Sequence, residues 1–128
     1  TAIALFPDVG TSYVLPRLPG AMGAWLALTG ARLRGADAVH AGLADHYVPK
    51  VRLPALRAAL VETGEAGAVA RLAEAPPAAS FAPHRAAIDR CFGQDTMPAI
   101  LAALAAEGTD WAAEQAAVLR RMSPTSMF

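Results

Sequence analysis

A single carboxylate, Asp8, occupies the place in this sequence that is best suited to chemistry. It follows the apolar run Ile3–Phe6 and a proline, and it precedes a valine and a glycine. Pro7 restricts its own φ and disfavours a helical Phe6, while Gly10 accepts the positive φ that a tight turn often needs. We therefore expect the acid at a rigid chain reversal, where folded scaffolds often display reactive groups.

Two interpretations of Asp8 stay open on local sequence alone. In the first, its side chain caps the helix that follows or closes an Asx-turn, as aspartates commonly do. In the second, it is an acid–base group of an active site. Only a wider pattern of residues can decide between them.

Other chemistries find less support in the residue types. His40, His46 and His84 are scattered, and no cysteine or carboxylate pair stands near them at metal-ligand spacing, so we expect no metal site. Cys91 has only Arg90 as a basic neighbour and is expected to be a buried, unreactive thiol. The sequence has no dinucleotide-binding glycine pattern, phosphate loop or Gly-x-Ser-x-Gly elbow.

Composition limits the partners. The 128 residues are 55% hydrophobic and 17% charged, enough for a core, although a thin one because many are alanine. The formal net charge of +0 gives no field that attracts nucleic acid or an anionic membrane, so we expect neither partner. A lone cysteine forms no intrachain disulfide, and no apolar run reaches the ~20 residues of a membrane span. These features predict a reduced, cytoplasmic protein.

The elements that must position Asp8 are mostly helical. In the first part of the chain, apolar spacing and glycine or proline breaks predict helices over 11–18, 21–29 and 36–41 and a strand over 44–48. Helical structure is expected from Leu53 to Leu72, interrupted at Gly64 and Gly67, and a hinge at 75–77 follows it. Three further helices are expected to start near Pro83, Asp95 and Thr109. Thr11 or Ser12 is expected to cap the first helix. The prediction is a mainly helical chain with one short strand.

Segments in a fixed order form a wider pattern. They are Phe6–Gly10 (FPDVG), Ser12–Leu18 (SYVLPRL), Leu28–Ala38 (LTGARLRGADA), Ala41–Pro49 (AGLADHYVP) and His84–Phe92 (HRAAIDRCF). Together they resemble the crotonase family, the enoyl-CoA hydratases and isomerases. Within it the similarity is greatest to the 3-hydroxyisobutyryl-CoA hydrolase branch, because hydratases typically carry glycine where this chain has Asp8.

The resemblance implies hydrolysis of a thioester in a coenzyme A conjugate. In that branch two backbone N–H groups polarise the thioester carbonyl, a glutamate acts at the acyl carbon, and an aspartate positions the substrate hydroxyl and assists proton movement. Of these parts, only the aspartate has a counterpart here, Asp8, with Phe6 and Gly10 as substrate-binding neighbours. The glutamate would stand just before Thr1, and the oxyanion groups further upstream.

A fold and a domain plan follow from the same resemblance. Residues 1–50 would end the core of an α/β crotonase fold and hold the Asp8 turn, and residues 51–128 would form a C-terminal helical region truncated at its end. The chain would be a fragment, inactive alone, of an acyl-CoA hydrolase of valine catabolism. We expect no cofactor beyond the coenzyme A of the substrate, and a homo-oligomer stays open.

Two rival hypotheses remain. The parent protein could instead be an enoyl-CoA hydratase or isomerase of the same family. Alternatively, this region could be a helical oligomerisation module. The apolar helix around Trp25 and the thin core support that hypothesis.

Overall fold

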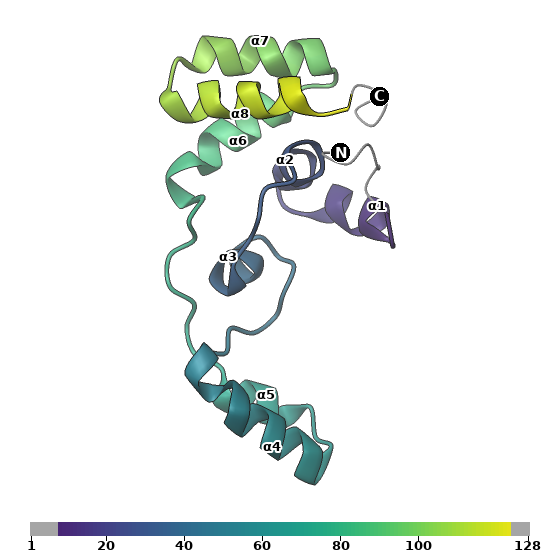
Figure 1. Ribbon diagram of the computed structural model, residues 1–128, viewed down its shortest axis with the longest axis vertical. Helices are drawn as coiled ribbons and strands as arrows, with labels where there is room; N and C mark the ends of the chain where they lie inside the picture. Colours follow the sequence, from purple (N-terminus) through teal and green to yellow (C-terminus); the bar gives the residue numbers. More distant parts are fainter. Residues whose placement is uncertain (1–7, 124–128) are drawn as a thin grey trace. The chain divides into compact units, whose positions relative to one another are not determined.

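The computed structural model describes residues 8–123, and their regular elements are helices (Figure 1). The α-helices are α1 (Thr11–Val14), α2 (Met22–Thr29), α3 (Gly35–His40), α4 (Leu53–Thr63), α5 (Gly67–Leu72), α6 (Arg85–Phe92), α7 (Met97–Glu107) and α8 (Asp110–Arg121). Short 3-10 turns, η1 (Leu15–Arg17), η2 (Lys50–Arg52) and η3 (Ala82–His84), precede or follow them. The prediction of a mainly helical chain is confirmed.

The predicted strand over 44–48 is reduced to a single antiparallel bridge in the described chain. Tyr47 pairs with Glu74, whose N–H donates to the Tyr47 carbonyl at 2.9 Å. The residues have the composition of a strand, but a strand needs a neighbour along its whole length. The described residues supply that neighbour at one position only.

The chain divides into two compact units. The first combines the residues up to Arg32 with those from Phe81 onward, and the second comprises Leu33–Ser80. The predicted boundary at residue 50 concerns the longer family fold, and it stays a prediction.

The core of the first unit is built from α2, α6, α7 and α8. Its fully buried large side chains are Met22, Ile88, Phe92, Leu104 and Leu119. Trp25 on α2 meets Phe81 edge-on at 6.1 Å between ring centroids, and its indole N–H donates to Gln115 Oε1 at 2.9 Å. The predicted helix over 21–29 is thus confirmed and lies in the core, and it ends at Gly30 in the left-handed conformation, with φ 65°.

Two of the predicted helix starts are displaced by one residue. Thr96, not Asp95, caps α7, because its extended backbone lets Oγ1 accept the N–H of Ala99 at 3.3 Å. Gly10, not Thr11 or Ser12, is the N-cap of α1, and it makes no side-chain cap bond. The helix expected to start near Thr109 is present as α8, and the Thr109 hydroxyl caps it by accepting from Ala112 N at 3.2 Å.

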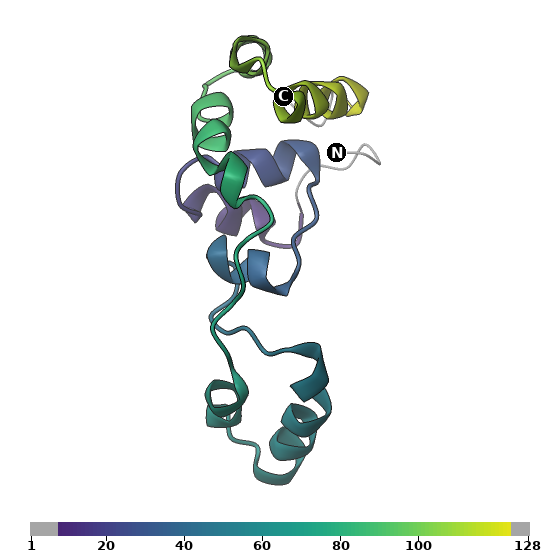
Figure 2. The ribbon, with the colours of Figure 1, turned by 90° about the vertical axis from the view of Figure 1, so that its left-hand side faces the viewer.

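In the second unit, α4 and α5 pack as a pair (Figures 1 and 2). Arg52 pairs with Glu74 at 2.7 Å, which joins η2 to the segment after α5. None of the residues of α4 is buried, so its apolar side chains lie partly or fully in solvent.

Candidate functional site

Asp8 lies on a tight turn that leads directly into α1. Its backbone carbonyl accepts the N–H of Thr11 at 3.0 Å, and the Thr11 hydroxyl donates to the same oxygen at 2.5 Å. Between them Val9 and Gly10 both have positive φ, 53° and 79°. Gly10 therefore takes the conformation that the sequence predicted for it.

Val9 is the strained residue of this turn. A β-branched side chain is rarely found at positive φ, because Cβ then crowds the following backbone, at a cost of about 1–2 kcal/mol. The Val9 side chain is 94% exposed, so no burial within the described chain offsets that cost. Strain of this kind is concentrated at functional sites, where it fixes the direction of a neighbouring group.

The carboxylate of Asp8 neither caps α1 nor closes an Asx-turn. Its one hydrogen bond to the described residues joins Oδ1 to the adjacent N–H of Val9 at 2.7 Å, whereas an Asx-turn requires the N–H two residues on. The side chain is exposed, and its second oxygen has no partner between residues 8 and 123. Phe6, predicted to bind substrate, lies outside the described residues. The catalytic role of Asp8 and the substrate-binding role of Gly10 stay predictions.

The segment after the Asp8 turn is stiffened by Arg17. Its guanidinium lies 3.5 Å from the centre of the Tyr13 ring, and Nη1 donates to the Tyr13 carbonyl at 2.6 Å. Leu15 in η1 then packs its backbone directly against Gly23 of α2, at a position where a side chain could not be placed. The turn that carries Asp8 is in this way joined to the core of the first unit.

A second acid, Asp37, is buried, and sequence reasoning did not single it out. It is 3% exposed, and its two oxygens accept the backbone N–H of Arg34 at 3.0 Å, the N–H of Ser80 at 2.6 Å and the Ser80 hydroxyl at 3.0 Å. Burial alone would raise the pKa of Asp37, but these hydrogen bonds and the Arg34 charge outweigh it and hold the pKa below 3.8. Both oxygens of Asp37 thus accept hydrogen bonds from the fold. We interpret this carboxylate as a structural group that joins the start of α3 to Ser80.

We expect Asp37→Ala to lower the free energy of unfolding by about 2 kcal/mol at neutral pH, because two backbone N–H groups lose their acceptor. The folded pKa is depressed, so this contribution is complete above the ordinary 3.8 and is lost as the pH falls through the folded value. Urea titrations at pH 7 and near pH 3 measure both effects. Asp45→Asn, an exposed acid of the same unit, is the control, and an equal loss at both pH values would contradict the linkage.

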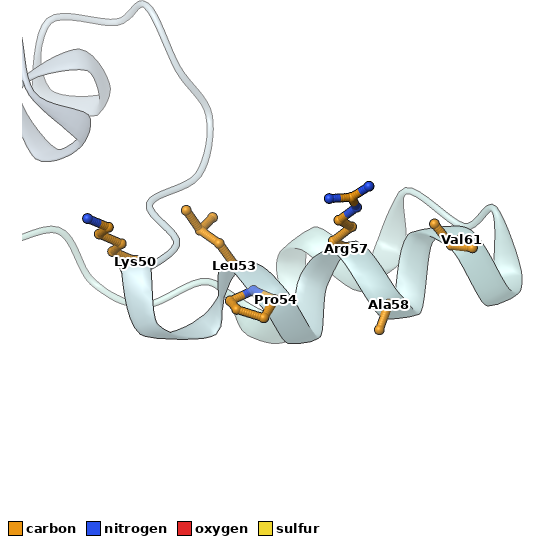
Figure 3. A pocket seen from close by; sticks show the side chains of 6 residues that line it. All are labelled: Lys50, Leu53, Pro54, Arg57, Ala58 and Val61. Carbon is orange, nitrogen blue, oxygen red and sulfur yellow. The ribbon is translucent and has the colours of Figure 1, made fainter.

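An open groove runs along η2 and α4 (Figure 3). Lys50, Leu53 and Arg57 point to one side of the helix there, with Val61 a turn further on. Leu53 and Val61 remain 48% and 82% exposed. The lining contains no carboxylate, hydroxyl, thiol or imidazole, so we interpret the groove as a surface for contact. The helix around Trp25, expected to support an oligomerisation module, is instead covered by α6 and α8.

Cys91 and His84 both have contacts within the fold. Cys91 is buried as predicted, and burial raises the pKa of its thiol. His84 stacks on Trp111 with ring centroids 5.0 Å apart. Within residues 8–123 no three His, Cys, Asp or Glu side chains gather as metal ligands. No helix in that part of the chain is both long and apolar enough to cross a membrane.

Comparison with known proteins identifies relatives along the whole chain. The family model of the enoyl-CoA hydratases and isomerases matches residues 1–128. A probable 3-hydroxyisobutyryl-CoA hydrolase of Arabidopsis thaliana is 40% identical over an alignment of 139 residues, gaps included. The alignment covers 99% of this chain and 37% of that protein. The mitochondrial 3-hydroxyisobutyryl-CoA hydrolase of Rattus norvegicus is 41% identical, with 99% of this chain and 36% of its own length covered.

Two solved structures share the fold. A carnitinyl-CoA dehydratase from Mycobacterium thermoresistibile superposes with a TM-score of 0.91 and 41% identity over 98% of this chain and 37% of its own. An enoyl-CoA hydratase from Rhodobacter sphaeroides gives 0.85 and 43% over 98% and 36%. The chain thus spans a little over a third of the length of the proteins it matches.

The predicted cytoplasmic location is contradicted by these relatives. The rat, mouse, frog and human hydrolases are all named as mitochondrial proteins. The lack of a second cysteine is compatible with a reducing setting, but it does not distinguish one such compartment from another.

The resemblance carried by the Asp8 turn and the segments after it is confirmed by a family model that spans every residue and by solved structures of the same fold. The chain belongs to the enoyl-CoA hydratase/isomerase family, the crotonase superfamily.

Proposed function

We propose that this chain is part of an acyl-CoA thioester hydrolase that acts on 3-hydroxyisobutyryl-CoA or a similar short hydroxyacyl-CoA. The observation that carries the proposal is the Asp8 turn, which holds an exposed carboxylate beside a strained Val9, with one oxygen that has no partner among residues 8–123. Curated relatives named 3-hydroxyisobutyryl-CoA hydrolases, 40% and 41% identical, support the choice of substrate. Such a substrate would place the enzyme in valine catabolism.

In this proposal Asp8 accepts a hydrogen bond from the substrate hydroxyl and assists proton movement near it. Hydrolysis adds the oxygen of water to the thioester carbonyl carbon, the carbon–sulfur bond breaks, and the leaving thiolate of coenzyme A takes up a proton. The free hydroxy acid is the second product. The glutamate and the oxyanion N–H groups implied by the family resemblance belong to the rest of the polypeptide. The 128 residues alone are therefore expected to be inactive.

Hydration of an enoyl-CoA is the second candidate. It is favoured by the two solved structures, which are named as a carnitinyl-CoA dehydratase and an enoyl-CoA hydratase and are 41% and 43% identical to this chain. Asp8 is the feature that favours hydrolysis, since hydratases typically carry glycine there. Self-association is a third property that stays a proposal.

The two reactions are distinguished by their products. The full-length polypeptide that contains this chain is incubated with 3-hydroxyisobutyryl-CoA and, separately, with crotonyl-CoA. We expect a thiol reagent to detect free coenzyme A from the first, and the ultraviolet absorbance of the conjugated thioester to stay nearly constant with the second. Rapid loss of that absorbance without thiol release would establish the hydratase instead. Turnover by the 128-residue chain alone would contradict the part assigned to the absent residues.

A further inference from the structure

Two side chains of α6 hold the backbone of a turn in the first unit. Asp89 Oδ1 accepts the N–H of Ala21 at 2.9 Å, and the Nη2 of Arg85 donates to the carbonyl of Pro19 at 2.8 Å. The two side chains, four residues apart on the helix, are joined by Arg85 Nε and Asp89 Oδ2 at 3.1 Å. Together they bind the Pro19 carbonyl and the Ala21 N–H, which lie on either side of Gly20.

Gly20 makes this close approach possible. Its φ is +60°, and a Cβ at this position would lie 2.2 Å from Asp89 Oδ1 and 2.9 Å from Arg85 Nη2. A side chain would therefore push the carboxylate and the guanidinium away from the backbone that they bind. The two side chains of α6 can therefore reach the backbone of this turn only when residue 20 is glycine.

The pair is charged when it binds the turn. Burial alone would raise the pKa of Asp89, but the Ala21 N–H and the Arg85 guanidinium outweigh it and hold the pKa below 3.8. The carboxylate is thus ionised at neutral pH, where its bonds to the N–H and the guanidinium are charge-assisted.

Hydrogen bonds connect this turn to the Asp8 turn almost without a break. Leu18 N donates to the Leu15 carbonyl at 3.1 Å, and Arg17 donates to the Tyr13 carbonyl at 2.6 Å. Tyr13 N and Val14 N both donate to the Gly10 carbonyl, at 3.0 and 3.2 Å. The segment from Gly10 to Leu18 is therefore held by its own hydrogen bonds. Asp8 lies just before its first residue, and the turn bound by α6 lies just after its last.

We propose that Arg85 and Asp89 are positioning residues for Asp8, which fix the far end of the segment that carries it. This inference rests on the proposed function, because it assumes that the Asp8 carboxylate takes part in the reaction. A displacement of about 1 Å at a reacting group can lower a rate by roughly 10²-fold even when the substituted residue is remote. Loosening the Gly20 turn should therefore slow catalysis without weakening substrate binding.

The core packing of α6 does not depend on this pair. The buried residues of the helix are Ala87, Ile88, Cys91 and Phe92, whereas the side chains of Arg85 and Asp89 are 31% and 40% exposed. Replacing either of the two should leave α6 packed in the core. A loss of activity can then be separated from a loss of fold.

A double-mutant cycle in the full-length enzyme tests the proposal. We expect Asp89→Ala to lower kcat roughly 10- to 100-fold with little change in KM, measured well below the melting temperature. In the Asp8→Asn background the same change should have almost no effect, since the group it positions is already lost. Arg90→Gln, which removes the ion pair of α6 with Glu107, is the matched control and should leave kcat unchanged.

The possible outcomes separate this inference from the function on which it rests. If Asp8→Asn leaves kcat unchanged, the catalytic role of Asp8 fails and the positioning role fails with it. If Asp8→Asn lowers kcat while Asp89→Ala does not, or if their effects multiply, only the positioning role is overturned. Should Asp89→Ala unfold, Arg85→Gln decides by the same kcat criterion, because it removes the bonds of Arg85 to the Pro19 carbonyl and to Asp89 Oδ2 but keeps the carboxylate that binds Ala21 N.

Discussion

Asp8→Asn is expected to lower kcat/KM of the full-length enzyme for 3-hydroxyisobutyryl-CoA by about 10²–10⁴-fold. Asparagine keeps the size of the side chain and still accepts the N–H of Val9, but it cannot take up a proton. The single bond of Asp8 to the described residues is local and exposed, so the free energy of unfolding should change by less than about 0.5 kcal/mol. Steady-state kinetics and urea unfolding measure the two quantities.

Asp45→Asn is the matched control for this substitution, since Asp45 is also exposed and has no hydrogen bond or ion pair to the described residues. Its kinetics should equal those of the unsubstituted enzyme. Unchanged kinetics of Asp8→Asn would leave Asp8 as an ordinary residue of a surface turn. A large loss of stability would instead mean that Asp8 contacts parts of the fold beyond residues 8–123.

Gly23→Ala is expected to destabilise the first unit by about 3 kcal/mol. Helix propensity alone predicts the opposite, a gain of up to about 1 kcal/mol, because alanine is the better helix former. However, the new Cβ would lie 1.8 Å from the Leu15 carbonyl oxygen and 2.5 Å from its carbon. Both are backbone atoms that cannot rotate away, so α2 and η1 must separate and the clash outweighs the propensity.

The measurement is the midpoint and slope of urea unfolding for the purified protein. Gly67→Ala is the control, because Gly67 starts α5 and its added Cβ would meet nothing closer than Arg71 Nη1 at 3.5 Å. That variant should be neutral or more stable by about 0.5–1 kcal/mol. If Gly23→Ala were as stable as the control, the close contact described between Gly23 of α2 and Leu15 of η1 would be contradicted.

The helices could largely be predicted from the sequence because their signals are local. Gly30 and Gly108 end α2 and α7 in the left-handed conformation, and Thr109 caps α8 through its own hydroxyl. Each signal acts within one helical turn, so no knowledge of the fold is required. The same locality explains the one-residue error at Asp95, since two neighbouring residues both have side chains suited to a cap.

The contacts that join the elements could not be predicted. Asp37 binds Ser80, 43 residues away, and Asp89 binds Ala21, 68 residues away. Periodicity and capping rules describe neighbours along the chain and do not reveal which distant residues meet. The strand over 44–48 was over-predicted for the same reason, because its existence depends on a partner strand.

The candidate site was predicted in two steps of different kinds. Pro7 and Gly10 predicted a turn at Asp8, and the positive φ of Gly10 confirms that part. The catalytic role came only from the family resemblance. The strain at Val9 was not foreseen, because a β-branched residue ordinarily argues against positive φ. It became visible only in the backbone geometry.

The most direct test of the central claim is the structure of the full-length Asp8→Asn enzyme with bound 3-hydroxyisobutyryl-CoA. The measurement is the distance from the side-chain oxygen or nitrogen at position 8 to the substrate hydroxyl oxygen. We predict a hydrogen bond of about 2.6–3.2 Å, with the thioester carbonyl close by. A side chain at position 8 that faces bulk solvent, with the hydroxyl held by other residues, would contradict the claim.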